Sequence, residues 1–219
     1  IVASMDAKGY FDHIVHSVTF LALRRWGLPD APILSMIHAI QTMTHYVHTA
    51  YGDSTDSYGY DPNLPPFMGI LQGNGNAGTS ANSVAAVLVD MMKEAGFGLP
   101  MWSSICKEAI KLILSSFIDD DMLFQGGPDN YTSGEDIYRT MQPALDYWES
   151  VLQVTGGAIA HEKSYWYLID FKWQSNAWIY QPKAETLGNL HLSQGSTGTP
   201  TQIARLEVSE AHELLGLML

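Results

Sequence analysis

Two acidic sites at the ends of apolar, strand-like segments constrain this chain more than any other feature. Asp6 follows the apolar run 1–5, and Asp119 begins a run of three aspartates after the apolar run 112–118. Aspartates between apolar strands are costly unless their carboxylates face solvent or hold cations. Sites built only from oxygen ligands favour hard ions such as Mg²⁺ or Mn²⁺ over zinc. The pattern leaves two interpretations, a solvated hairpin turn and a divalent-ion site.

The remaining segments favour an α+β fold with an antiparallel sheet, because strands and helices follow one another without regular alternation. Both ends of the chain are apolar and strand-like, so we expect a fragment truncated at both ends. No apolar run approaches the ~20 residues of a membrane span, and we expect no membrane partner. Periodicity and turn residues predict strands over 1–6 and 163–173, and two short strands within 112–124 that flank an acidic turn at 119–121. They predict helices over 13–26, 30–47, 79–95, 102–109 and 135–154.

Charge and cysteine content limit the function classes. The formal net charge is −12, the wrong sign for a protein that grips phosphate backbones with basic grooves. Composition alone therefore argues against nucleic acid as a partner. The single cysteine, Cys106, excludes an internal disulfide framework and fits a reducing, intracellular compartment, nuclear or cytoplasmic.

Five short motifs give the acidic sites a more specific meaning. They are Asp6 with Phe11, Gly69-Ile70-Leu71-Gln72-Gly73 with Asn82, Phe117-Ile118-Asp119-Asp120, Gly156-Gly157 with Lys163-Ser164, and Leu215-Gly216. In this order they resemble the palm motifs of reverse transcriptases, the RNA-directed DNA polymerases. The resemblance is closest to the enzymes of non-LTR retrotransposons and group II introns.

The resemblance implies a polymerase palm over residues 1–219, an antiparallel sheet packed against helices with the fingers and thumb largely missing. It implies a nucleotidyltransferase that adds deoxynucleotides to a primer 3′-hydroxyl. The implied partners are an RNA template, a DNA primer, deoxynucleoside triphosphates, and the fingers and thumb of a longer protein. In the family those parts supply many of the basic contacts to nucleic acid, which partly reconciles the acidic charge with the function.

The resemblance also implies a metal site. Asp6, Asp119 and Asp120 would be catalytic carboxylates that hold two Mg²⁺ ions, with Mn²⁺ as a substitute, and the Ala7 carbonyl would be a backbone ligand. Two divalent ions ~3.5–4 Å apart can activate the 3′-hydroxyl and stabilise the leaving pyrophosphate. Asp121 is left outside this set, because successive side chains of a strand point to opposite faces.

Other residues would handle the substrate. Phe11 would pack under the sugar and clash with a 2′-hydroxyl, which favours deoxynucleotides. Gln72 and Gly73 would line the template and nucleotide pocket, and Lys163 would stabilise or protonate the leaving pyrophosphate. The sequence departs from the family pattern at Ala160, where an Asn is usual, and at 77–78, where Ser-Pro is usual.

Two alternatives stay open at this point. Residues 73–78 read Gly-x-Gly-x-x-Gly between an apolar run and a helix, as in a dinucleotide-binding oxidoreductase. That motif requires a second parallel strand with an acidic end about 20 positions on, whereas 90–96 falls within and just after the predicted helix. The other alternative is a catalytically inactive retroelement remnant that kept the fold.

Overall fold

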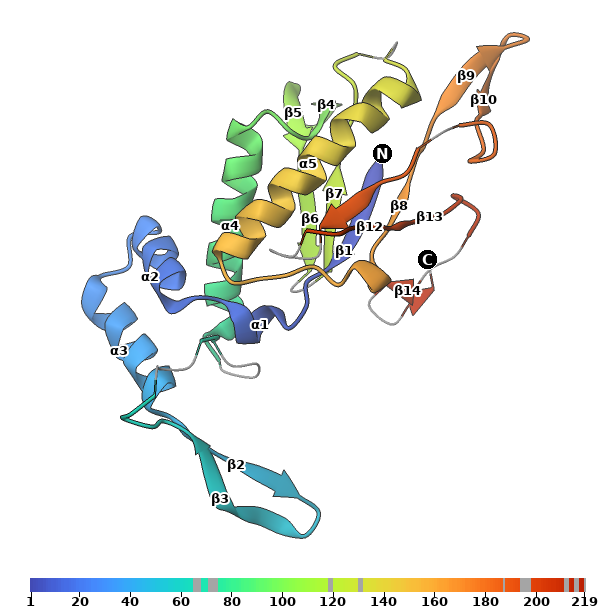
Figure 1. Cartoon of the computed structure of the whole chain (residues 1–219). Helices are drawn as coiled ribbons and strands as arrows, with labels where there is room; N and C mark the ends of the chain where they lie inside the picture. The colour runs from blue at the N-terminus through green and yellow to red at the C-terminus, as the bar shows by residue number, and fades with distance from the viewer. Residues whose placement is uncertain are drawn as a thin grey trace. The chain divides into compact units, whose positions relative to one another are not determined.

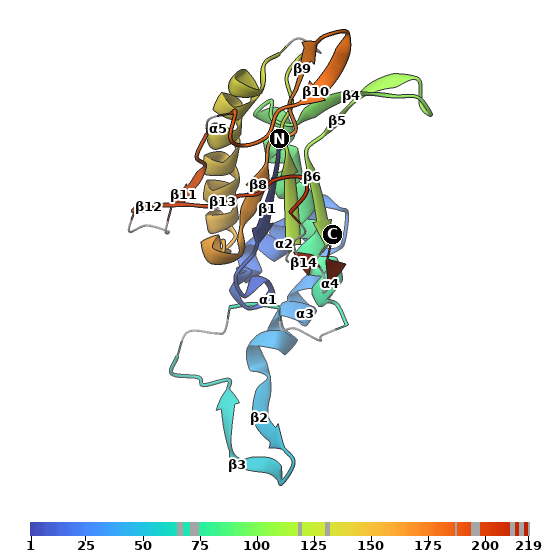
Figure 2. The same ribbon diagram turned by 90° about the vertical axis from the view of Figure 1, so that its right-hand side faces the viewer.

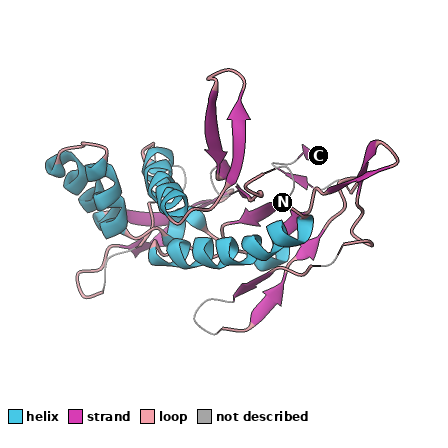
Figure 3. Cartoon of the chain, turned by 90° about the horizontal axis from the view of Figure 1, so that it is seen from above, coloured by secondary structure: helices cyan, strands magenta, loops and turns pink. Residues whose placement is uncertain are grey.

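The structure of the chain, a computed structural model, is shown in Figure 1. It describes residues 1–64, 68–70, 75–117, 120–129, 132–186, 188–193, 198–210, 213–214 and 217–218. These residues form two compact units, one of residues 1–8 with 88–219 and one of residues 9–87. Helix α4 (Ala77–Glu94) runs from the second unit into the first. The described residues form both helices and strands (Figure 3), which follow one another along the chain without regular alternation, so the fold class is α+β, as predicted.

A five-stranded sheet forms the centre of the first unit. In spatial order its strands are β13 (Ala204–Arg205), β8 (Tyr165–Tyr167), β1 (Val2–Asp6), β7 (Asp120–Phe124) and β6 (Leu114–Phe117). Neighbouring strands are antiparallel except for the parallel pair β13 and β8. The first strand of the chain is therefore internal to the sheet, between β7 and β8 (Figure 2). The strand predicted over 1–6 is confirmed, and the two strands predicted within 112–124 are β6 and β7.

The two faces of this sheet differ in burial. Ala3 and Met5 are 0% and 2% exposed and pair with Leu123 and Asp121 of β7. Helix α5 (Gly134–Val154) lies against this face (Figure 2), where its Tyr138 stacks on the buried Trp166 of β8 with ring centroids 5.8 Å apart. Because side chains alternate along a strand, Asp6 and Asp120 belong to the opposite, half-buried face.

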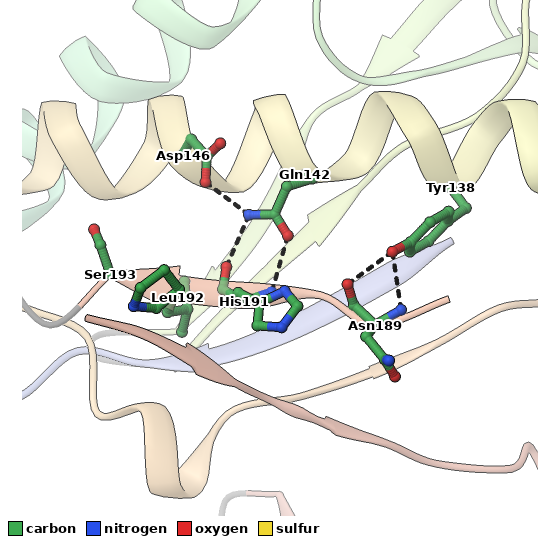
Figure 4. A pocket seen from close by; sticks show the side chains of 8 residues that line it. Tyr138, Gln142, Asp146, Asn189, His191, Leu192 and Ser193 are labelled. Carbon is green, nitrogen blue, oxygen red and sulfur yellow. Dashed lines mark hydrogen bonds between the residues drawn. The ribbon is translucent and has the colours of Figure 1, made fainter. Parts of the chain in front are cut away.

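The helix predicted over 135–154 is confirmed as α5. Its side chains also hydrogen-bond to the later segment around His191. The Ser133 side chain caps the helix by accepting a hydrogen bond from the Asp136 amide. The amide of Gln142 donates to the His191 carbonyl at 2.8 Å, and the His191 N–H donates back at 2.9 Å (Figure 4). Gln142 thus binds the backbone of β11 (His191–Ser193), which also pairs with β12 (Pro200–Gln202).

Hairpins make up the other strand pairs. They are β2 (Thr44–Thr49) with β3 (Gly52–Gly59), β4 (Leu99–Ser103) with β5 (Glu108–Leu112), β9 (Phe171–Gln174) with β10 (Ala177–Tyr180), β11 (His191–Ser193) with β12 (Pro200–Gln202), and β14 (Glu213–Leu214) with β15 (Leu217–Met218). The helix predicted over 102–109 is wrong, because that stretch belongs to the β4–β5 hairpin. Its turn places Lys107 at a φ of 59°, a left-handed conformation that a helix does not contain.

The strand predicted over 163–173 is interrupted. Its first residue, Lys163, ends the 3₁₀ helix η1 (His161–Lys163), its middle holds β8, and its last residues begin β9. The turn between β9 and β10 places Ser175 and Asn176 at φ of 52° and 65°, as expected of a tight hairpin turn. Trp173 and Trp178 face each other across this hairpin, with ring centroids 5.3 Å apart.

The second unit is mainly helical and holds α1 (Tyr10–His13), α2 (His16–Arg25) and α3 (Asp30–Thr42). The helix predicted over 13–26 is thus split before residue 16. The helix predicted over 30–47 ends at Thr42, because the β-branched and aromatic stretch 44–49 forms β2 instead. Among the described residues, no helix combines the length and apolar character needed to cross a membrane.

Candidate active site

The sheet brings the two acidic sequence sites together. Asp6, the last residue of β1, lies directly opposite Asp120, the first residue of β7. The Asp6 carbonyl accepts a hydrogen bond from the Ala160 N–H at 2.8 Å. The N–H and C=O groups of Asp6 therefore point away from β7. Asp6 and Asp120 therefore form a non-hydrogen-bonded cross-strand pair, the position at which antiparallel strands approach to ~4.5 Å between Cα atoms. Two carboxylates directly opposite on one face repel each other, and a shared cation relieves that repulsion.

A backbone clamp fixes the end of β1. Besides the bond from Ala160, the Lys8 N–H donates to the Ala158 carbonyl at 2.8 Å, and Ala7 forms an isolated antiparallel bridge with Ile159. The buried Ser164 hydroxyl donates to the Ala160 carbonyl at 2.9 Å and so helps to hold Ala160 in position. The clamp lies between the glycines and the lysine of the fourth motif, but sequence reasoning did not identify its backbone role.

The clamp also orients the Ala7 backbone. The bonds made by Asp6 and Lys8 flank Ala7, so Ala7 and Ile159 form a non-hydrogen-bonded pair. In such a pair the N–H and C=O of each residue point to the outer edges. The Ala7 carbonyl is therefore directed to the edge of β1 on which β7 lies. This direction fits the backbone ligand predicted from the sequence.

Lys163 reaches the same carboxylate. Its ammonium lies 3.2 Å from Asp6 Oδ2 and 3.4 Å from Oδ1. The Lys163 side chain is 63% exposed and the Asp6 side chain 23%, so solvent screens the pair. A pair this exposed contributes ~0–1 kcal/mol to stability. Its geometry instead places a solvent-exposed positive charge next to the candidate metal ligands.

Asp121 lies on the other side of the sheet from this pair. It is 5% exposed and faces Met5 and Ser116 across the two neighbouring strands. The alternation expected along β7 is thus observed, and Asp121 lies outside the candidate site.

Three predicted site residues fall outside the described residues, namely Asp119, Gln72 and Gly73. Within the described residues, which do not include Asp119, no group of three or more His, Cys, Asp or Glu side chains is arranged to hold a metal ion. The convergence of Asp6 with Asp119 stays a prediction. The donors that are described near Asp6 are oxygens, which fit Mg²⁺ or Mn²⁺.

Phe11 belongs to the second unit, where it lies on the single turn of α1. Its ring packs edge-on against that of Tyr10, with centroids 5.8 Å apart. The Phe11 carbonyl accepts a hydrogen bond from the Ile70 N–H at 2.8 Å. Phe11 of the first motif is thereby joined to the segment that precedes Gln72 and Gly73 in the sequence.

The described residues count against the dinucleotide-binding alternative. After α4 the chain enters β4, which pairs antiparallel with β5 rather than continuing a parallel βαβ unit. A Cβ atom added at Gly75 or Gly78 would meet nothing within 4 Å. The fingerprint requires its last glycine for close packing of helix on strand, and Gly78 makes no such approach.

Comparisons with known proteins add little to this geometry. No protein-family model matches the chain, and no curated protein matches it. Among solved structures, the chain is similar to a telomerase from Candida albicans in complex with the TWJ fragment of telomeric RNA, at 13% identity and a TM-score of 0.42. The match covers 86% of this chain and 28% of the telomerase chain.

Proposed function

We propose that the chain is the palm of an RNA-directed DNA polymerase. The observation that carries the proposal is the position of Asp6 directly opposite Asp120 on the half-buried face of an antiparallel sheet. These are two of the three carboxylates that the family motifs single out, and they come from distant parts of the sequence. If the acidic residues only formed a solvated turn, Asp6 would not need to pair with Asp120, and no backbone clamp would need to hold the end of β1.

In this proposal, Asp6, Asp119 and Asp120 hold two Mg²⁺ ions with the help of the Ala7 carbonyl. When bound, the ions activate the primer 3′-hydroxyl and stabilise the leaving pyrophosphate. The Lys163 ammonium lies 3.2 Å from the Asp6 carboxylate, and as a cation it would stabilise the leaving pyrophosphate or give it a proton.

The substrates in this proposal are an RNA template, a DNA primer and deoxynucleoside triphosphates. Phe11 would exclude ribonucleotides by contact with the 2′-hydroxyl, and Gln72 with Gly73 would line the base-pair pocket. Fingers and thumb of the full-length protein would close over the triphosphate and hold the duplex. The 219-residue chain alone should therefore extend primers poorly, since substrate positioning is worth several kcal/mol.

Primer extension on an RNA template tests the proposal in the full-length protein. Asp6→Asn and Asp119→Asn should abolish extension while leaving the fold intact, because Asn keeps the volume and removes the charge that holds the ions. Asp53→Asn, the same change on the exposed β2–β3 hairpin, should leave extension unchanged. Near-normal extension by both variants would refute the polymerase assignment, and inactivity of the wild type would favour an inactive remnant.

A further inference from the structure

Phe11 lies on a helical turn that is too short to hold its own position. α1 has four residues, and a single turn of helix is unstable without outside contacts. Its first residue, Tyr10, is buried, and the Tyr10 hydroxyl donates to the Ala81 carbonyl at 3.2 Å. Phe11 itself is half-buried, so its orientation depends on what supports the rest of the turn.

The segment 68–70 supplies much of that support. The Ile70 N–H donates to the Phe11 carbonyl at 2.8 Å, and the Gly69 N–H donates to the Ile14 carbonyl at 2.9 Å. Gly69 has a φ of +92°, and a Cβ atom there would lie 2.6 Å from the Asp12 carbonyl oxygen. Only glycine permits this approach of two backbones.

A buried histidine outside the five motifs holds this segment in place. His16 is 8% exposed, and its Nε2 lies 2.6 Å from the Gly69 carbonyl oxygen. The Gln41 side-chain nitrogen lies 2.9 Å from His16 Nδ1. An amide nitrogen only donates, so Nδ1 accepts and Nε2 carries the proton that it donates to Gly69. Gln41 thus fixes the tautomer that His16 needs to bind Gly69.

We propose that His16 is a positioning residue for Phe11 and so sets how strongly the site rejects ribonucleotides. His16 acts through the Gly69 carbonyl, which anchors the two backbone hydrogen bonds that support α1. This inference rests on the proposed polymerase function for its consequence, but its physical basis lies wholly within residues 9–87.

Hydrogen–deuterium exchange of the 219-residue chain tests the physical basis without any activity. His16→Leu removes both ring hydrogen bonds, and the Gly69 and Ile70 amides should then exchange about tenfold faster, as expected for the loss of roughly one hydrogen bond. His16→Gln keeps a donor for Gly69 and should recover part of the protection. His38→Leu, an exposed histidine on α3, is the matched control and should change nothing. Unchanged exchange at both amides in a folded His16→Leu chain would overturn the inference.

Gly69→Ala provides a second variant if His16→Leu does not fold. The added methyl group forces the segment away from Asp12, so exchange at Ile70 should rise at least as much as in His16→Leu. Gly75→Ala, where a Cβ meets open space, is its control. Equal exchange in the two alanine variants would contradict the support assigned to segment 68–70.

The functional consequence is measured in the full-length protein as the ratio of kcat/KM for a deoxynucleotide to that for the matching ribonucleotide. His16→Leu should lower this ratio about tenfold while primer extension with deoxynucleotides continues, and His16→Gln should restore part of it. A merely structural role would reduce both activities together. An unchanged ratio with faster amide exchange would overturn the link to sugar selection. Absence of extension in every variant, wild type included, would count against the proposed function, and the exchange data would still decide the role of His16.

Discussion

The two ends of strand β1 differ in their surroundings, which are acidic at one end and mainly apolar at the other. At the Asp6 end, Asp6 and Asp120 lie opposite each other on the half-buried face of the sheet, and a backbone clamp holds the end of β1 that carries Asp6. At the Val2 end, a groove of about 630 Å³ is lined mainly by apolar side chains, among them Ile169, Phe171 and Trp178. Burial and aromatic contacts at the apolar end stabilise the fold, whereas repulsion between the two carboxylates at the acidic end destabilises it. Such a local cost is expected where a site must bind cations.

Replacing Ala160, whose N–H binds the Asp6 carbonyl, is expected to have the largest effect on stability and on extension. Ala160→Pro removes the N–H that binds the Asp6 carbonyl, and the proline ring, which takes the place of the amide hydrogen, pushes that carbonyl away from its position 2.8 Å from the nitrogen. The Asp6 carbonyl then lacks a buried partner, and unfolding free energy should fall by about 1–3 kcal/mol. Denaturant unfolding measures this loss, and metal-dependent extension should fall with it.

Ala160→Ser keeps the backbone N–H and is the matched control for this change. If the proline variant is as stable and as active as the serine variant, the clamp does not position Asp6.

Disrupting the tryptophan pair at the apolar end is expected to have a smaller and purely structural effect. Trp178→Ala removes the edge-to-face contact with Trp173 and should cost about 0.5–1.5 kcal/mol of stability. Metal-dependent extension should stay unchanged, because this hairpin lies at the end of the sheet away from Asp6. The exposed Trp102 on the β4–β5 hairpin offers a control, Trp102→Ala. A loss of divalent-ion binding in Trp178→Ala would contradict the separation of the two ends.

Removing the lysine at the acidic end should strengthen ion binding. Lys163→Gln eliminates a positive charge beside Asp6, and a unit charge at ~4 Å in water is worth ~1 kcal/mol, or about fivefold in affinity. Mn²⁺ titration should show tighter binding in the variant at low salt and a smaller difference at high salt. Lys172→Gln, which breaks the pair with Glu185, is the control. Weaker Mn²⁺ binding in Lys163→Gln would show that the lysine supports the ions rather than competing with them.

The smallest effect on stability is expected from replacing Glu207, whose carboxylate binds Tyr180 of β10 and the Lys183 backbone. The hydrogen bond from the Tyr180 hydroxyl at 2.7 Å, followed by one from the Lys183 N–H, lowers the pKa of Glu207. A lowered folded-state pKa gives stability that is complete above the ordinary glutamate pKa and is lost as pH falls through the folded value.

Unfolding measured against pH should therefore show a slightly shallower loss of stability toward acid in Glu207→Gln than in the wild type. Identical pH profiles for the two proteins would mean that Glu207 carries no net stabilisation.

The sequence could predict the parts of this fold that carry strong local patterns. The apolar run before Asp6 and the two runs around Asp119 each indicate a strand, and the motif resemblance implies that they pair. Helix α5 follows from its amphipathic period and its cap at Ser133. The same kind of reasoning failed over 102–109, where a short segment without clear periodicity forms a hairpin rather than a helix.

Other parts of the site leave no readable sequence signal. The clamp on Asp6 uses backbone groups of Ala158 and Ala160, so no side-chain pattern marks it. His16 depends on contacts with Gln41 and Gly69, both distant in the sequence. Such roles arise only when the fold brings separate segments together.

Locating the bound divalent ions tests the proposed metal site most directly. Fe²⁺ can replace Mg²⁺ and, with peroxide and ascorbate, cut the polypeptide next to the ion. We expect cuts near Asp6, near 119–120 and near the clamp at 158–160, all suppressed by excess Mg²⁺ and lost in Asp6→Asn. Cuts confined to other segments, or an unchanged pattern in Asp6→Asn, would contradict the assignment of this end of the sheet as a two-metal polymerase site.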